Sequence, residues 1–257
     1  MVEYAELHAH TNYSFKEGAS FPDEMALRAV ELGYRALAIT DHDNLVGSME
    51  YAQAAKGIGL HAITGAEVTL EGGGHLTLLA TVQQGYSNLC RLLSFAHVFN
   101  NRLEPALGRE LLADHAEGLI LLTGCAKGPV PQLLMKGKRG EATATLLQYQ
   151  EWFGPGNVYL ELQQNLVYGD TELIKRLTEL GHELDVPLVA TNNAHFHVRE
   201  LHRLQDTLMA IRHNKSLEEM RHQLRPNTEA HLKSPKEMAK LFHELPEAIS
   251  NTLIIAE

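Results

Sequence analysis

Two histidines, His8 and His10, lie one residue apart directly after a short apolar stretch near the start of the chain. Side chains alternate across a β-strand, so positions i and i+2 point to the same side and both imidazoles can reach one metal ion. A single pair with this spacing is a weak signal, because short motifs of this kind are common in proteins that bind no metal. The signal gains weight because residues of metal-ligand type recur at later predicted strands.

Each of the later residues also has an ordinary structural interpretation. Glu67 taken alone is an ion-pair partner, Cys125 alone is a small buried hydrophobe, and His97 alone suits the negative end of a helix. In parallel α/β barrels, however, functional groups gather where the strands end. Residues of metal-ligand type occur in or directly after five predicted strands, which favours a metal site with several ions. These residues are His8, His10, His42, Glu67, Cys125 and His195.

The elements that must position these residues alternate along the chain. Short apolar or β-branched runs are followed by amphipathic helical stretches, which is typical of a parallel sheet with helical crossovers. The predicted strands cover residues 4–8, 36–40, 61–70, 75–82, 119–122, 158–162 and 188–191. The predicted helices cover residues 22–32, 47–56, 86–100, 130–135, 141–152, 170–184, 201–211, 216–220, 235–242 and 246–257. Three glycines at residues 72–74 indicate a turn, so that residues 61–70 and 75–82 form a hairpin.

Composition excludes several classes of protein. The 257 residues suffice for one large α/β domain, and no apolar run reaches the length of about 18 residues that a membrane span requires. The net charge of −10 argues against a broad surface for nucleic acid but permits a small anionic substrate, because bound cations invert the local charge. Fifteen histidines suit a metalloenzyme. Two cysteines and the lack of a signal peptide predict a cytoplasmic protein with reduced thiols and no membrane partner.

Five spaced motifs resemble those of the PHP (polymerase and histidinol phosphatase) family. They are residues 7–10 (LHAH), 39–43 (ITDHD), 65–67 (GAE), 122–125 (LTGC) and 190–195 (ATNNAH). The likeness runs from residue 3 to about residue 212 and is greatest to the N-terminal PHP domain of bacterial C-family DNA polymerases, the DNA polymerase III α and error-prone types. It implies a distorted, TIM-like (β/α)7 barrel over residues 1–212. Residues 213–257 would be a helical extension leading towards an absent polymerase region.

The resemblance also implies two to three divalent ions, with zinc, manganese or iron as the metal. One ion would be held by His8, His10 and Glu67, and Glu67 would bridge to a second ion held by His97 and Cys125. The ligands of a third ion would be Glu17, His42 and His195, together with Asn193.

Two of these positions depart from the family pattern. Glu17 stands where the family has aspartate or histidine, and Asn193 stands where active members have aspartate. A neutral amide oxygen is a poorer ligand for a divalent cation than a carboxylate. Asp41 and Asp43 either orient neighbouring ligands or cap the helix that follows them.

The implied activity is a metal-dependent phosphoesterase, in its specific form a 3′–5′ exonuclease of a DNA polymerase α subunit. The nucleophile would be a hydroxide bridging the ions, with no catalytic side chain. The substrate would be a phosphate ester such as a DNA 3′ end, and the partners would be a polymerase region or replication and repair proteins. Arg102, Lys127 and Arg199 are candidates for phosphate binding by position alone. An inert metal-binding module of a polymerase and a free-standing phosphatase for small molecules are the alternatives.

Overall fold

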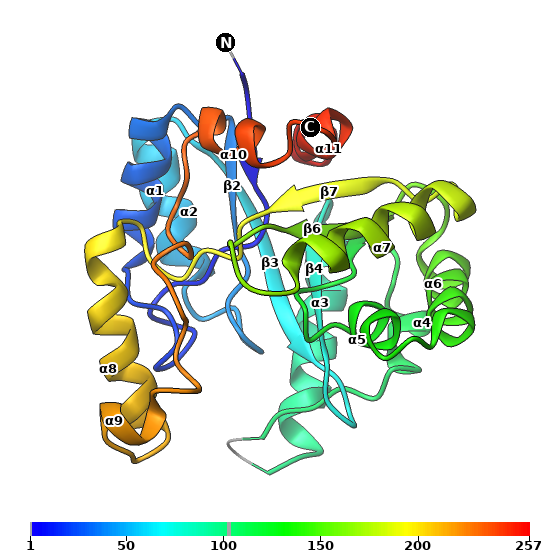
Figure 1. Cartoon of the computed structure of the whole chain (residues 1–257), viewed down its shortest axis with the longest axis horizontal. Helices are drawn as coiled ribbons and strands as arrows, with labels where there is room; N and C mark the ends of the chain where they lie inside the picture. Colours follow the sequence, from blue (N-terminus) through cyan, green and yellow to red (C-terminus); the bar gives the residue numbers. More distant parts are fainter. Residues whose placement is uncertain (1, 102–103) are drawn as a thin grey trace.

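A barrel-shaped sheet forms the centre of this computed structural model, which describes residues 2–101 and 104–257 (Figure 1). Its strands are hydrogen-bonded in chain order: β1 (Ala5–Glu6), β2 (Ala36–Ile39), β3 (His61–Thr69), β4 (His75–Ala80), β5 (Leu119–Leu122), β6 (Val158–Gln163) and β7 (Leu188–Thr191). β4 runs antiparallel to both of its neighbours, and the other neighbouring strands run parallel. The hairpin predicted at residues 72–74 is therefore present.

The segments that follow β1 and β7 nearly close the sheet into a barrel. The amide of His10 donates to the carbonyl of Ala194 at 2.7 Å, and the amide of Ala194 donates to the carbonyl of His8 at 3.0 Å. With this closure, the predicted distorted (β/α)7 barrel is confirmed.

Helices surround the barrel and join its strands. The predicted helices are present, η1 overlaps the start of the helix predicted from residue 201, and the short α4 occurs without a sequence signal. None of the helices in the described ranges is long and apolar enough to cross a membrane. The helices are α1 (Pro22–Leu32), α2 (Ser48–Ile58), α3 (Gln83–Val98), α4 (Leu111–Asp114), α5 (Pro129–Met135), α6 (Arg139–Phe153), α7 (Asp170–Leu184), η1 (Arg199–Leu201), α8 (His202–Arg212), α9 (Leu217–Met220), α10 (Pro235–Leu241) and α11 (Pro246–Ala256).

The inside of the barrel changes from apolar to polar along the strands. Near the starts of most strands, inward side chains form one apolar cluster that includes Ala36 of β2, Ile63 of β3 and Tyr159 of β6. Glu161 stands two residues after Tyr159 on the same face of its strand, and Glu67 stands four residues after Ile63 on the same face. Each glutamate is 2% exposed. The barrel therefore places its buried charged groups where most strands end.

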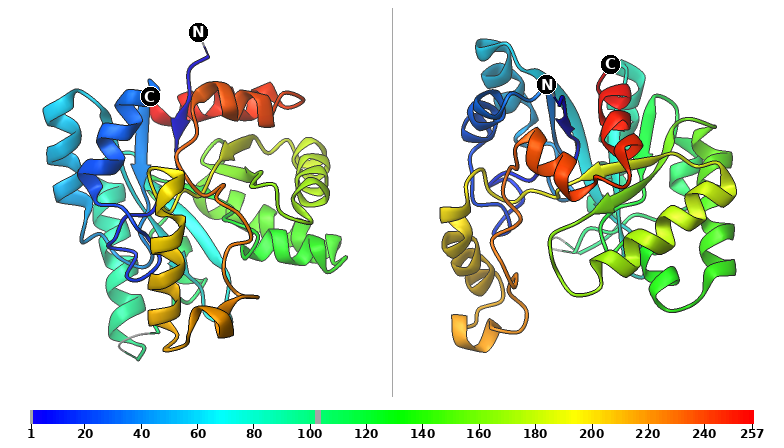
Figure 2. Two further views of the ribbon diagram at one scale, coloured as in Figure 1. Left: turned by 60° about the vertical axis from the view of Figure 1, so that its left-hand side comes forward. Right: turned by 45° about the horizontal axis from the view of Figure 1, so that its top comes forward.

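The residues after 212 pack against the barrel. Thr252 of α11 accepts a hydrogen bond from the amide of Ala5 at 3.3 Å, and Asn251 donates to the carbonyl of Leu188 at 2.7 Å. Leu232 and Met238 belong to the main apolar core. Both chain termini consequently lie at the same end of the barrel (Figure 2). The division of the chain at residue 212 stays a prediction.

Candidate metal centre

Glu67 lies at the centre of four histidines. Its Oε1 lies 3.7 Å from His8 Nε2 and 3.3 Å from His75 Nδ1, and its Oε2 lies 3.5 Å from His10 Nε2 and 3.3 Å from His42 Nε2. Ligand atoms of His8, His10 and Glu67 lie within 4.8 Å of one another, and so do those of His42, Glu67 and His75. Two groups that share one carboxylate could hold two ions bridged by Glu67.

Three ligand atoms of this cluster are buried and have no hydrogen-bond partner: His8 Nε2, His10 Nε2 and Glu67 Oε1. Buried polar atoms of proteins are normally paired, so each unpaired atom needs an explanation. A set of imidazole nitrogens and carboxylate oxygens suits zinc, manganese and iron. The residues present therefore fit divalent cations.

His75 is a member of the cluster that the sequence analysis missed. It is the first residue of β4, and because β4 is antiparallel to β3, His75 pairs with Thr69 near the end of β3. Most ligands were expected where strands end, which is the correct place only in a parallel strand. The hairpin at residues 72–74 was the available signal, since it already required β4 to be reversed.

Glu161, which the sequence analysis also missed, orients His8. The Nδ1–H of His8 donates to Glu161 Oε1 at 2.6 Å, which leaves Nε2 of His8 directed at the cluster. Burial alone would lower the pKa of His8, but Glu161 and Glu67 outweigh it and raise this pKa to about 10. Burial would likewise raise the pKa of Glu67, but His8 and the other histidines hold it well below its usual value. A glutamate inside an otherwise apolar strand was the available signal.

Asp41 acts on His10 through Ser14. The Nδ1–H of His10 donates to Ser14 Oγ at 2.9 Å, and the hydroxyl of Ser14 donates to Asp41 Oδ1 at 2.7 Å. Asp43 accepts from the amide and the hydroxyl of Thr69, both at 2.7 Å. Neither aspartate caps α2, which begins after Gly47 without a side-chain cap. Asp41 therefore orients a ligand, whereas Asp43 binds Thr69, and its Oδ2 lies 3.9 Å from His42 Nδ1.

His97 does not join either group. It is exposed, and its Nε2–H donates to the backbone carbonyl of Asp43 at 2.7 Å. The physical reason is its place near the end of α3 on the outside of the barrel, whereas His75 stands on a strand. The second group thus contains His75 in the place where His97 was expected.

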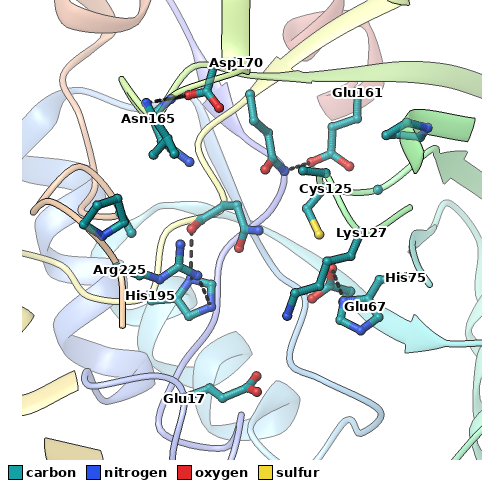
Figure 3. Close-up of a pocket in the computed structure, with 18 of the residues that line it drawn as sticks. Glu17, Glu67, His75, Cys125, Lys127, Glu161, Asn165, Asp170, His195 and Arg225 are labelled. Carbon is teal, nitrogen blue, oxygen red and sulfur yellow. Dashed lines mark hydrogen bonds and ion pairs between the residues drawn. The ribbon is translucent and has the colours of Figure 1, made fainter. Parts of the chain in front are cut away.

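A cavity of about 370 Å³ opens beside the cluster (Figure 3). Glu17, Cys125, Asn193 and His195 line it together with His42, Glu67 and His75. Burial and, to a smaller extent, Glu67 raise the pKa of the Cys125 thiol. The ring of His195 lies 4.4 Å from the ring of His10, measured between centroids. Of the predicted ligands, only His97 thus lies outside both the cluster and the lining of the cavity.

Arginines contact two of these residues. Arg212 forms an ion pair with Glu17, and Arg225 Nη2 lies 2.8 Å from His195 Nε2 and 3.0 Å from His195 Nδ1. Burial and then Arg225 hold the pKa of His195 well below its usual value. The irregular segment that carries Arg225 gave no sequence signal.

The three basic residues proposed from position have different surroundings. Lys127 lines the cavity. Arg199 pairs with Glu229 at 2.5 Å, and Arg102 lies outside the described residues. Lys127 is therefore the one of the three that the described structure brings to the site.

Comparisons with known proteins give a consistent result. The family model described as PHP domain matches residues 6–165. An error-prone DNA polymerase of Symbiobacterium thermophilum is 40% identical over 273 residues, which cover 100% of this chain and 25% of that protein. DNA polymerase III subunit alpha of Treponema pallidum is 34% identical over 270 residues, covering 100% of this chain and 23% of that protein. The chain thus spans about a quarter of the length of these relatives.

A solved structure shares the fold. It is a crystal structure from Bifidobacterium adolescentis whose description names a metal-dependent phosphoesterase. The TM-score is 0.55 at 15% sequence identity, and the match covers 76% of this chain and 88% of that one. At this identity the likeness supports the barrel architecture only.

Proposed function

The chain belongs to the PHP domain family, and from this premise and the cluster around Glu67 we propose that it is a metal-dependent phosphoesterase. The observation that carries the proposal is the set of buried ligand atoms without partners, beside a cavity of about 370 Å³. Cavities of this size accept small organic ligands. A phosphate ester is the substrate class that suits a pocket lined by divalent cations.

We assign one ion to His8, His10 and Glu67 and a second ion to His42, Glu67 and His75, with Cys125 beside them. When bound, ions of this kind supply Lewis acidity, which neutralises charge on a phosphoryl group and acidifies water. Glu161 fixes the tautomer of His8. Hydrogen bonds of this kind to the second ring nitrogen orient the ligand and raise its basicity.

The specific form that we propose is phosphodiester hydrolysis of the 3′–5′ exonuclease type, within a DNA polymerase. Two facts support it. The relatives that match over the whole chain are named as DNA polymerases. Beyond the polar wall, the cavity has an apolar wall that includes Leu173, Ile174 and Leu177 of α7, which suits the organic part of a nucleotide. The partners would then be a polymerase region and a DNA end.

A second function is favoured by Asn193. Its neutral amide stands at the cavity where a carboxylate would bind a cation more tightly. The domain would in that case bind ions but act as an inert structural module of a polymerase. The two functions differ in their response to the substitution Asn193→Asp.

The test is hydrolysis of 5′-labelled single-stranded DNA and of bis-p-nitrophenyl phosphate, with added manganese or zinc. The control is the double variant His10→Ala/His42→Ala, which removes one ligand from each group. The phosphoesterase proposal is refuted if wild-type turnover does not exceed that of the control. Turnover that appears only in Asn193→Asp would favour the inert module.

A further inference from the structure

We infer that the guanidinium of Arg225 takes the place of the third ion, so that this chain holds two ions and uses Arg225 to bind the phosphoryl group. The inference rests on the metal site proposed above. It concerns the residues that the family resemblance implies as ligands of a third ion. Their contacts in the structure differ from those of the ligands around Glu67.

A positive charge already lies against the ring of His195. Its Nδ1–H donates to the carbonyl of Asn193 at 2.9 Å, which leaves the lone pair of the neutral ring on Nε2. Arg225 Nη2 lies 2.8 Å from that Nε2 and 3.0 Å from Nδ1, so the guanidinium lies over the face of the ring and not along the lone pair. A divalent ion on that lone pair would lie within a few ångströms of the guanidinium, and like charges this close repel each other.

The carboxylate expected for the third ion is paired with an arginine, since Glu17 Oε1 accepts from Arg212. Of the other members of this set, His42 belongs to the second group around Glu67 and Asn193 is uncharged. Asn193 Oδ1 is buried without a partner, but one neutral oxygen is a weak ligand for a divalent cation. The contrast with the Glu67 cluster is direct, because there Nε2 of both His8 and His10 is buried and free of partners.

Arg225 itself lacks an anionic partner. Within residues 2–101 and 104–257, no carboxylate oxygen lies within 4.0 Å of its guanidinium, although the residue is partly buried. Charges removed from water are normally paired. Figure 3 shows Arg225 and His195 across the cavity from Cys125 and Lys127. A phosphoryl oxygen in that cavity would supply the missing anion, and guanidinium groups bind phosphate through paired, charge-assisted hydrogen bonds.

The first experiment counts ions. The 257-residue chain is incubated with manganese or zinc and then desalted. The number of metal ions per chain is measured by elemental mass spectrometry. We expect two ions per wild-type chain, and three in the double variant Asn193→Asp/Arg225→Ala, which restores a carboxylate and frees His195. Arg225→Lys keeps the positive charge and should hold two. Arg221→Ala is the matched control, because Arg221 is exposed on the same segment and contacts Glu218 and its neighbour His222.

Asn193 has a positive φ of 49°, a conformation that aspartate also tolerates, so the Asp substitution should not strain the backbone. Three ions in the wild type, or two in a folded double variant, would overturn the inference. If the double variant does not fold, the wild-type count alone decides between two and three.

The second experiment measures binding of inorganic phosphate to the metal-loaded chain by calorimetry. Arg225→Ala should weaken it by about tenfold or more, the usual effect of losing a charged hydrogen bond, and Arg221→Ala should not change it. Equal phosphate affinity in wild type and Arg225→Ala would contradict the phosphate role. Neither measurement needs turnover, so a failure of the proposed phosphoesterase activity remains distinguishable from a failure of this inference.

Discussion

Replacing Glu161 with glutamine should isolate the effect of one negative charge on the metal ligand His8. Glu161 Oε1 accepts all of the hydrogen bonds described for this carboxylate, from His8 Nδ1 at 2.6 Å, Thr191 Oγ1 at 2.5 Å and Gln163 Nε2 at 2.8 Å. Oε2 is buried without a partner. Glutamine can therefore keep its carbonyl oxygen at the Oε1 position and place its amide nitrogen at the Oε2 position. The three hydrogen bonds survive, and only the charge is lost.

The expected loss of metal affinity follows from two opposing effects. Removing an outer partner of a metal-bound histidine typically costs 10–100-fold in affinity. In the metal-free chain, however, the pKa of His8 is raised to about 10, so at pH 7 an ion must displace a proton that Glu161 also stabilises. Metal binding replaces the proton on His8 by an ion of charge +2 and so adds one positive charge near Glu161. The negative charge of Glu161 therefore still favours the metal-loaded state. We therefore expect a loss of about tenfold at pH 7, or about 1.4 kcal/mol, and a larger loss near pH 10.

The assay is a competition titration of manganese or zinc against a chromophoric chelator, at pH 7 and pH 10. Glu151→Gln is the matched control, because Glu151 is exposed on α6 and the same charge is removed away from the site. Circular dichroism of the metal-free variant checks that the fold is retained. Wild-type affinity of Glu161→Gln at both pH values would refute the role that we assign to Glu161.

Three further predictions follow from particular contacts. His75→Ala should lose one of the two bound ions, because His75 belongs to the second group, whereas His97→Ala should keep both; equal metal content in the two variants would contradict this assignment. Burial lowers the pKa of His231 to about 4. The unfolded chain therefore takes up this proton near pH 6.5 and the folded chain only near pH 4, so stability should fall on acidification across this interval. His231→Gln should flatten that fall in urea denaturation measured at pH 7 and pH 5. Gly85→Ala should destabilise the fold by about 2 kcal/mol or more, because its Cβ would lie 1.8 Å from a backbone oxygen. Gly140→Ala has open space and should be neutral or stabilising by about 0.5–1 kcal/mol, and thermal melts of the two variants check the pair.

Local patterning predicts most of the barrel because its strands are short apolar runs with clear limits. Residues 119–122 and 188–191 were predicted to the residue, since each run is fully buried and flanked by polar or turn-forming residues. The helices over residues 22–32 and 170–184 were also predicted with their observed bounds. α4, with four residues, carries too little periodicity to be detected from sequence.

The site is less predictable because some of its members depend on contacts between distant segments. Arg225 lies in an irregular stretch between α9 and α10, and no local pattern says what it will contact. Arg225 is brought to His195 by backbone pairing between segments that are distant in the sequence. The amide of His195 donates to the carbonyl of Ala230 at 2.8 Å, and Phe196 forms a β-bridge with His231. Such pairing fixes the position of a side chain only once the barrel is formed.

His75 is a different case, because the information was in the sequence. In a barrel of parallel strands, side chains at the strand ends meet on one rim. A hairpin reverses one strand, so the residue that reaches this rim is the first of the reversed strand and not the last. The three glycines before His75 indicated that reversal. Thr77, two positions on and on the same face of β4, also faces the cluster, since its Oγ1 lies 3.2 Å from His8 Nδ1. His97 lies near the end of α3, and its ring contacts the backbone carbonyl of Asp43 and belongs to neither group. Strand direction, and not the spacing of histidines along the chain, therefore decides which histidine completes the second group.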